Sequence, residues 1–356
     1  MWTGIMNESP GQGEEELERA IEEAEAEILV VGCGGAGGNT VSRILEAGVE
    51  GAENVAVNTD AQDLLHTSAN RKVLIGREVT GGLGAGNDPK LGKKAAVESK
   101  NSLKELLQGK DMVFVTCGLG GGTGTGASPV IADIASGFGA LTVGVVTLPL
   151  EVEGRRRSEN AKGGLRELRK TVDASVIIPD DNILKIAPDL PIGEAFRAAD
   201  EILMSTIKGV TELITEPGLI NLDFADVRTV LQDGGISQVG MGESDDEDRA
   251  LEAAEEALEN PLLETEVSGA EEALVNVTGP LDMSLDEAEI IADRVSVEVG
   301  PGVNIVWGAR VSEELKNSVR VMVLIPGASS PYDRGLDIER KEAKQKLEKK
   351  IKIIEK

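Results

Sequence analysis

The chain has 356 residues and a mass of 37.4 kDa, enough for two domains of ordinary size. Its 63 acidic and 36 basic residues give a net charge of −27, and aromatic side chains make up only 2%. A body this negative repels phosphate backbones and offers few rings for base stacking, which argues against nucleic acid as a partner.

Scarce residue types exclude several kinds of site. His66 is the single histidine, so one chain cannot form a two-histidine metal site. Cys33 and Cys117 are too few for a disulfide framework or a zinc site, and we interpret them as small residues packed at strand ends. The N-terminus is acidic and no apolar run approaches ~20 residues, so we expect a cytoplasmic chain without a transmembrane segment.

Short apolar runs then alternate with helical stretches, after an N-terminal extension at 1–26. The predicted strands are 28–31, 55–57, 72–75, 112–116, 141–148 and 176–179. One predicted helix follows the glycines of 32–38 and continues through Leu45. Two further helices are predicted at about 91–107 and 128–136. Continuous apolar strands that alternate with helices indicate a parallel sheet covered on both faces. The fold class is therefore α/β.

A long helix is predicted over 192–214, because apolar residues recur at helical spacing from Phe196 to Ile214. Pro217 and Gly218 end it. A smaller α/β unit follows, with helices near 224–233, 246–259 and 284–296 and strands near 236–240, 272–278, 303–310 and 318–325. The expected divisions are an extension at 1–26, a first domain at 27–191, a central helix at 192–217, a second domain at 218–327 and a tail at 328–356.

The first glycine motif, Gly32–Asn39, lies between a strand and a helix and satisfies GxGxxG. Glycines let the backbone approach a phosphate, and the helix N-terminus supplies free N–H groups. Asn58 and Asp60 follow the second strand, where dinucleotide-binding domains place a ribose-binding acid. A nicotinamide-dependent oxidoreductase is therefore one alternative.

The second glycine motif argues against that alternative. Gly120–Gly126 contains five glycines in seven residues, an entropic cost that a simple turn does not explain. Two such loops at one sheet edge can hold a phosphate chain from both sides. The sequence lacks the lysine-containing P-loop pattern, so backbone N–H groups must hold the phosphates. A third glycine-rich piece, 81–89, is either a loop that senses the terminal phosphate or a flexible surface loop.

Six motifs, in order and spacing, resemble the tubulin/FtsZ superfamily, and most closely its FtsZ family in the archaeal variant. They are GCGGAGGN, VNTDAQ, GGLGAGNDP, GGGTGTG, EVEGRRR and NLDFADVRTVLQDGG. The resemblance covers about 27–327, and GGGTGTG is highly specific to the superfamily. It implies a GTP-binding domain at 27–191 and a GTPase-activating domain at 218–327.

The resemblance also implies which residues contact GTP or GDP. Glu153 and Arg157 match the ribose contacts, and Phe196 and Asp200 match the base contacts. A carboxylate such as Asp200 can accept from guanine N1–H and N2–H₂ together, which adenine does not offer. The residues alone favour Phe196 as a core residue and Asp200 as a surface residue of the helix. The expected nucleotide-binding residues around the phosphates and in VNTDAQ are Gly34, Gly35, Ala36, Gly37, Gly38, Asn39, Asn58, Asp60, Gly120, Gly121, Gly122, Thr123, Gly124 and Thr125.

Asn221, Asp223 and Asp226 are the candidate catalytic residues. Spacing alone favours a helix cap, because an N-terminal Asp with an acid three residues later stabilises a helix start. The resemblance implies instead that this loop enters the nucleotide site of the next subunit, where the acids polarise water and Asn221 positions it. A head-to-tail contact of this kind does not close, so it builds a filament.

The resemblance thus implies a self-assembling GTPase of the cell-division ring, with Mg²⁺ on the β- and γ-phosphates. A regulator of the same fold without turnover is a further alternative. Residues 339–356 carry eight basic and four acidic side chains, with Leu347, Ile351 and Ile354 on one helical face. This tail is either a solvated helix, an appended segment or a docking helix. We expect a membrane-tethering adaptor to bind the tail and to place the protein under the membrane at the division site.

Overall fold

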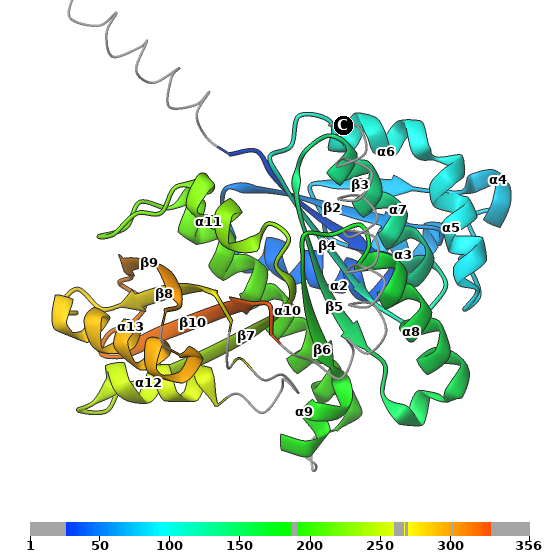
Figure 1. Cartoon of the computed structure of the whole chain (residues 1–356). Coiled ribbons are helices and arrows are strands. Elements are labelled where there is room, and N and C mark those ends of the chain that lie inside the picture. The colour runs from blue at the N-terminus through cyan, green and yellow to red at the C-terminus, as the bar shows by residue number, and fades with distance from the viewer. Residues whose placement is uncertain (1–25, 187–190, 260–266, 268–269, 301, 329–356) are drawn as a thin grey trace, which may run out of the picture.

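The structure is a computed structural model that describes residues 26–186, 191–259, 267, 270–300 and 302–328. Ten strands form one sheet in the order β3-β2-β1-β4-β5-β6-β7-β10-β8-β9 (Figure 1). The strands are β1 (Ile28–Cys33), β2 (Ala52–Asn58), β3 (Arg71–Leu74), β4 (Met112–Gly118), β5 (Leu141–Leu148), β6 (Ala174–Pro179), β7 (Gly235–Ser244), β8 (Glu272–Gly279), β9 (Asn304–Val311) and β10 (Val319–Pro326).

The first six strands are all parallel, as the sequence predicts. Both faces of this half-sheet are buried, because alternate residues of one strand enter different cores. On β1, Leu29 and Val31 belong to one apolar cluster and Ile28 and Val30 to another. A strand buried on both sides has no polar face, which explains its continuous apolar sequence.

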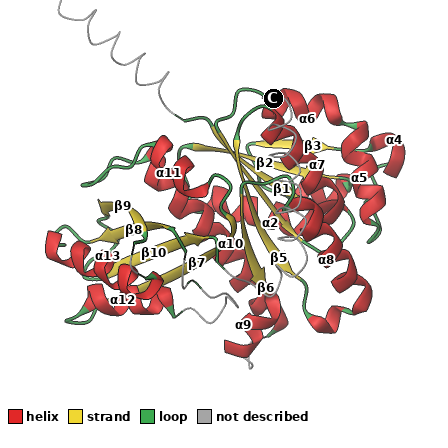
Figure 2. Cartoon of the chain, viewed as in Figure 1, coloured by secondary structure: helices red, strands yellow, loops and turns green. Residues whose placement is uncertain are grey.

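The helices cover both faces of the sheet (Figure 2). The cluster with Leu29 includes side chains of α5 to α8, and the cluster with Ile28 includes side chains of α2, α10 and α11. The helices are α2 (Gly34–Glu46), α3 (Ala61–His66), α4 (Arg77–Thr80), α5 (Pro89–Glu98), α6 (Lys100–Leu107), α7 (Thr123–Gly137), α8 (Arg155–Leu168), α9 (Asp180–Ile186), α10 (Ile192–Thr215), α11 (Phe224–Leu231), α12 (Arg249–Leu258) and α13 (Leu285–Val299).

Several of these helices differ from the sequence expectation, and the sequence does not predict α3, α4 or α9. The predicted helix at 91–107 is broken at Ser99, whose hydroxyl accepts from the Gly76 N–H at 3.0 Å. Helix α7 begins at Thr123, inside the glycine motif rather than after it. Helix α8 was not predicted, because its sequence is rich in charge and glycine and has few apolar residues.

The two expected domains share the sheet through a short contact. Only three residue pairs join β6 to β7, beginning with Ala174 opposite Gly235. Beyond β7, strands β10 and β8 are antiparallel to their neighbours and β9 is parallel to β8. Helices α12 and α13 pack on this part of the sheet in a separate apolar cluster. No helix in the described part of the chain is long and apolar enough to cross a bilayer.

Helix α10 connects the two halves, in agreement with the predicted central helix. It has 24 residues, so it is about 36 Å long. Leu203, Ile207 and Val210 are fully buried on its core face. The tail segment at 339–356 and nearly all of the extension at 1–26 lie outside the described residues.

Candidate functional site

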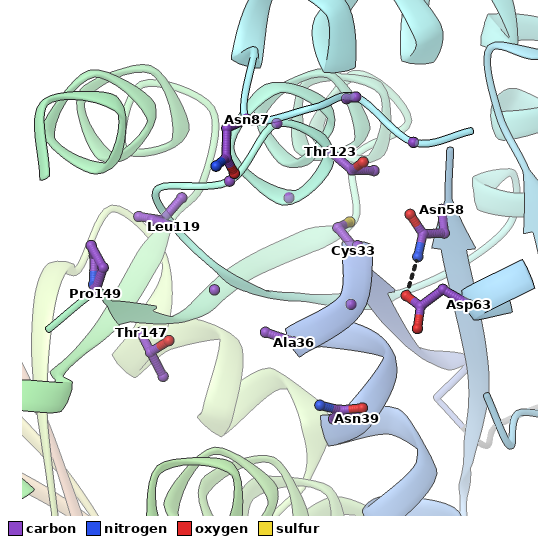
Figure 3. Close-up of a pocket in the computed structure, with 18 of the residues that line it drawn as sticks. Cys33, Ala36, Asn39, Asn58, Asp63, Asn87, Leu119, Thr123, Thr147 and Pro149 are labelled. Atoms are coloured by element: carbon purple, nitrogen blue, oxygen red, sulfur yellow. Dashed lines mark hydrogen bonds between the residues drawn. The ribbon is translucent and has the colours of Figure 1, made fainter. Parts of the chain in front are cut away.

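A cavity of about 770 Å³ opens where the parallel strands β1, β2, β4, β5 and β6 end. Open α/β sheets bind ligands at this edge, and the volume suits a nucleotide. Figure 3 shows several residues that line it, with Ala36 and Cys33 from the first glycine motif between Asn39 and Asn87. All three glycine-rich pieces of the sequence contribute to the wall.

Two helices begin at this cavity without a capping side chain. Helix α2 starts at Gly34, whose φ is +72°, and its N-cap Cys33 makes no side-chain cap. Helix α7 starts at Thr123, and its N-cap Gly122 has no side chain to offer. Gly34 and Gly124 approach so closely that a Cβ on Gly34 would lie 3.0 Å from the Gly124 nitrogen. Two sets of free N–H groups and two positive helix ends therefore meet at one place, which suits a phosphate chain.

Hydroxyl groups hold the second glycine loop in shape. The Thr125 Oγ1 accepts from the Gly120 N–H at 2.8 Å, and Gly120 has a φ of +111°. The Thr123 and Thr59 hydroxyls are 2.6 Å apart and connect this loop to the end of β2. These threonines are buried and hold the loop in place, and Thr123 also lines the cavity.

The third glycine-rich piece is packed against the second. A Cβ on Gly122 would lie 2.7 Å from the Ala85 Cβ, so the two loops are in contact. Leu83, Gly84, Ala85, Gly86 and Asn87 all line the cavity. The packing favours a loop that belongs to the site over a free surface loop.

The opposite end of the cavity is formed by the start of α10. Phe196 is 39% exposed and lines the cavity, so it is not a core residue despite its place in the apolar periodicity. The Asp200 Oδ2 lies 3.5 Å from the Arg43 Nε on α2. The Glu153 and Arg157 side chains form an ion pair of 2.6 Å at the same wall.

Burial changes the acidity of two carboxyl groups here. It raises the pKa of Asp180 to about 8, with further contributions from the nearby Glu153, Asp200 and Asp181 carboxylates, while Arg157 acts in the opposite direction. Burial also raises the pKa of Asp200 to about 6, against the effect of Arg43. Within the described chain, the Asp180 Oδ1 and the Arg157 Nε are buried without a hydrogen-bond partner. Polar atoms left this way in a cavity wall indicate a polar ligand.

Most of the expected nucleotide-binding residues line the cavity. They are Gly34, Gly35, Ala36, Asn39, Asn58, Asp60, Gly121, Gly122, Thr123, Gly124, Glu153, Arg157, Phe196 and Asp200. Gly37, Gly38, Gly120 and Thr125 are not among the lining residues. Gly37 lies against the main chain, since its Cβ would be 2.5 Å from the Thr116 oxygen, and Gly38 lies against Thr67. These four residues shape the loops rather than the cavity surface.

Sequence reasoning missed a further set of lining residues. They lie at the carboxyl ends of β4, β5 and β6, or next to residues already chosen: Asp63, Gly118, Leu119, Thr147, Pro149, Asp180 and Ala199. Asp63 accepts from the Asn58 Nδ2 at 2.7 Å and so orients that amide (Figure 3). The rule that ligands bind at the carboxyl ends of parallel strands would have indicated Thr147 and Asp180.

The three candidate catalytic residues do not line this cavity. Asp223 caps α11: its Oδ1 accepts from the Asp226 N–H at 2.9 Å, while the Asp226 Oδ2 accepts from the Asp223 N–H at 3.3 Å. The Asn221 Oδ1 accepts from the Gly218 N–H at 2.5 Å. All three residues are exposed. The cap expected from spacing is therefore present, and it leaves the acids accessible to another molecule.

The acids and the cavity lie at opposite ends of α10. Phe196 and Asp200 are in its first turns, whereas Asn221 follows its last residue, Thr215. At 1.5 Å per residue, about 29 Å of helix separates Phe196 from Thr215. The acids of one molecule therefore do not reach the cavity of that same molecule.

The loop before the acids is fixed to the second domain. The Leu219 and Ile220 N–H groups donate to the Ala309 carbonyl on β9, and the Ala309 N–H donates back to Ile220. Arg310 pairs with Glu212 at 2.7 Å and with Glu216, which ties the end of α10 to the same strand. The acids are thus presented on a rigid support.

Metal-ligating side chains do not cluster in the described part of the chain: no group of three or more His, Cys, Asp or Glu could hold an ion. Cys33 and Cys117 are buried, and burial raises the pKa of the Cys117 thiol to about 12, which agrees with their expected packing role.

Two family models match the chain. The GTPase domain of the tubulin/FtsZ family matches residues 27–188, and the C-terminal domain of the FtsZ family matches residues 235–329. Cell division protein FtsZ 1 of Pyrococcus abyssi is 56% identical over 90% of this chain and 86% of its own length. Cell division protein FtsZ of Methanothermobacter thermautotrophicus is 52% identical over 90% of this chain and 84% of its own length.

Solved structures agree with these matches. An empty FtsZ dimer from M. jannaschii superposes with a TM-score of 0.84 at 50% identity, and covers 90% of this chain and 93% of its own. CetZ2 from Haloferax volcanii, solved as a GTPγS-bound protofilament, has a TM-score of 0.73 at 24% identity, over 90% of this chain and 99% of its own. The second likeness supports the fold alone.

Proposed function

The chain belongs to the FtsZ family of the tubulin/FtsZ superfamily, and on this premise we propose that it is a GTPase that hydrolyses GTP between the subunits of a head-to-tail filament in cell division. The observation that carries the proposal is the separation of the two parts of the site. The cavity lies at the start of α10 and the exposed acids follow its end. Two molecules stacked along α10 bring the parts together.

The cavity residues have distinct roles in this proposal. The N–H groups at the starts of α2 and α7 bind the phosphates. Glu153 and Arg157 contact the ribose. Phe196 stacks on the guanine, and Asp200 accepts from its N1–H and N2–H₂ groups, while Asp180 supplies a second buried carboxyl group in the same wall.

The neighbour's acids supply the step that the cavity lacks. In the assembled site, Asp223 and Asp226 of the next subunit polarise the attacking water, and Asn221 orients that water. Water adds to the γ-phosphorus and the bond to the β–γ bridging oxygen breaks, which gives GDP and inorganic phosphate. Because the acids also cap α11, hydrolysis and the local fold of this interface depend on the same residues.

A magnesium ion would be held largely by the phosphates of a bound nucleotide, because no group of three or more potential ligands is found among the described residues. When bound, it would neutralise charge on the β- and γ-phosphates. The nicotinamide alternative has less support, because both family models that match the chain are of the tubulin/FtsZ type.

We also propose where the protein acts in the cell. We place the protein at the division site, under the membrane, with an adaptor bound to the C-terminal tail. The support is the family membership and the basic amphipathic pattern of 339–356.

GTP turnover measured against protein concentration tests the shared site. Specific activity should rise with concentration and fall toward zero on dilution, and Asp226→Asn should bind GTP with turnover reduced by at least about 100-fold. Asp133→Asn, on the exposed face of α7, is the matched control. Activity that stays constant down to high dilution contradicts a shared site, and wild-type binding without turnover favours a nucleotide-gated regulator.

A further inference from the structure

We propose that Asn160, on α8, is a positioning residue that fastens two loops of the cavity together and thereby favours a triphosphate over a diphosphate. The inference rests on the proposed guanine-nucleotide site. The Asn160 Nδ2 donates to the Asn87 carbonyl at 3.0 Å and to the Gly120 carbonyl at 3.1 Å. Asn87 belongs to the third glycine loop and Gly120 to the second. Asn160 does not line the cavity, so it acts through these loops.

The bond to Gly120 fixes the direction of a phosphate-facing N–H group. In a planar trans peptide, the carbonyl and the following N–H point in opposite directions. When the Gly120 oxygen is held toward α8, the Gly121 N–H therefore points away from α8, and Gly121 lines the cavity. The preceding peptide is also restrained, since the Gly120 N–H donates to the Thr125 hydroxyl. A Cβ on Gly120 would lie 3.1 Å from the Arg157 oxygen, so the loop is pressed against α8 here.

The bond to Asn87 fixes the end of the third loop. Asn87 has a φ of +58°, which is unusual for a residue other than glycine. The next N–H, that of Asp88, donates to the Ala85 carbonyl at 2.9 Å. The Asn87–Asp88 peptide is thus held at its oxygen by Asn160 and at its nitrogen by Ala85. This arrangement keeps residues Gly84 to Asn87 in the cavity wall.

The third loop lies at the phosphate end of the site. Figure 3 shows Asn87 beside Leu119 and Thr123, on the side of the cavity away from Asn39. Asn39 is one helical turn from Arg43, which pairs with Asp200 at the base end. In this proposal a diphosphate occupies the starts of α2 and α7, and the third phosphate extends toward the third loop. The Asn160 bonds therefore affect the triphosphate most.

The test compares affinities for GDP and for a non-hydrolysable GTP analogue in the variant Asn160→Asp. This isosteric change removes both donors and places a carboxylate against two carbonyl oxygens. Two lost hydrogen bonds predict analogue binding weaker by about tenfold or more, with GDP binding within about twofold of the wild type. With GTP, KM should rise more than kcat falls. Asn101→Asp, on the exposed face of α6, is the matched control.

Asn160→Ala removes the two hydrogen bonds without adding charge. It replaces Asn160→Asp in the same test if the aspartate variant does not fold. Asn160→Gln, which keeps the amide, should recover part of the analogue affinity. Equal losses for both nucleotides, or no loss for either, would overturn the inference. If the wild-type protein binds neither guanine nucleotide, the proposed function itself fails, which is a different result.

Discussion

Two buried carboxyl groups in the same wall have different surroundings and so different tasks. Asp200 faces Arg43, which favours its ionised form, and an ionised carboxylate is the acceptor that guanine requires. Asp180 has three carboxylates near it and only Arg157 as a cation, and burial raises its pKa to about 8. In the nucleotide-free protein at neutral pH, Asp180 is therefore largely protonated while Asp200 is largely charged.

Asp180 should make the nucleotide-free protein less stable as the pH rises. Its pKa is raised in the folded state, so the stability it contributes is full below about pH 4 and is lost as the pH approaches 8. One pKa unit corresponds to about 1.4 kcal/mol. Asp180→Asn should therefore raise the melting temperature at pH 8 by about 3 °C or more, and raise it less at pH 5.5.

Thermal denaturation without nucleotide, at both pH values, measures this effect. Asp133→Asn removes the same charge from the exposed face of α7 and controls for net charge. An equal gain for Asp180→Asn at both pH values would show that Asp180 does not titrate in this range.

The packing of α5 on α7 depends on glycine rather than on apolar side chains. A Cβ on Gly126 would lie 2.1 Å from the Pro89 oxygen, and one on Gly92 would lie 2.2 Å from the Gly122 oxygen. The second glycine motif therefore brings a neighbouring helix close at Gly126, while Gly121 to Gly124 face the cavity. One short stretch of sequence serves both packing and binding.

Gly126→Ala should destabilise the protein, because the new methyl group must push α5 away from α7. Overpacking of this kind costs about 1–3 kcal/mol, so we expect a melting temperature lower by several degrees and weaker nucleotide binding. Gly137→Ala is the control in the same helix, because a Cβ added there would meet no atom within 4 Å. Alanine is the better helix former there, and equal losses for both variants would refute the packing argument.

The whole molecule is asymmetric along α10, with a nucleotide cavity at one end and a rigidly supported acid loop at the other. Neither end is complete alone. A contact that joins one end to the opposite end of a copy repeats without closing, so it forms a filament. The same separation predicts that two inactive variants can restore each other.

Mixing Asp200→Asn with Asp226→Asn should recover GTP hydrolysis. The first variant loses the acceptor for guanine but keeps its acids, and the second keeps its cavity but lacks the acid. In a random equimolar filament, about one quarter of the interfaces pair an intact cavity with intact acids, so turnover should approach that fraction of the wild-type rate. Phosphate release from the mixture and from each variant alone measures it. A mixture no more active than its parts would contradict catalysis in trans.

The parallel sheet, the long helix and the glycine loops could be predicted from the sequence, because each is a local pattern. Buried strands such as 141–148 are continuously apolar, and α10 has a clear helical period. The motifs also indicated the family. Helix α8, which carries Asn160, escaped prediction because its residues show little apolar periodicity.

The features of the site that the sequence left undecided depend on contacts between segments that are far apart in the chain. Helical spacing alone favours Phe196 as a core residue, but the tertiary structure places it in the cavity wall. Asp180 and Asn87 line the cavity because strand ends and loops that are far apart in the chain meet at one sheet edge. Local sequence determines which backbone conformations are accessible, whereas the burial, pKa and partners of a side chain depend on what the rest of the fold brings against it.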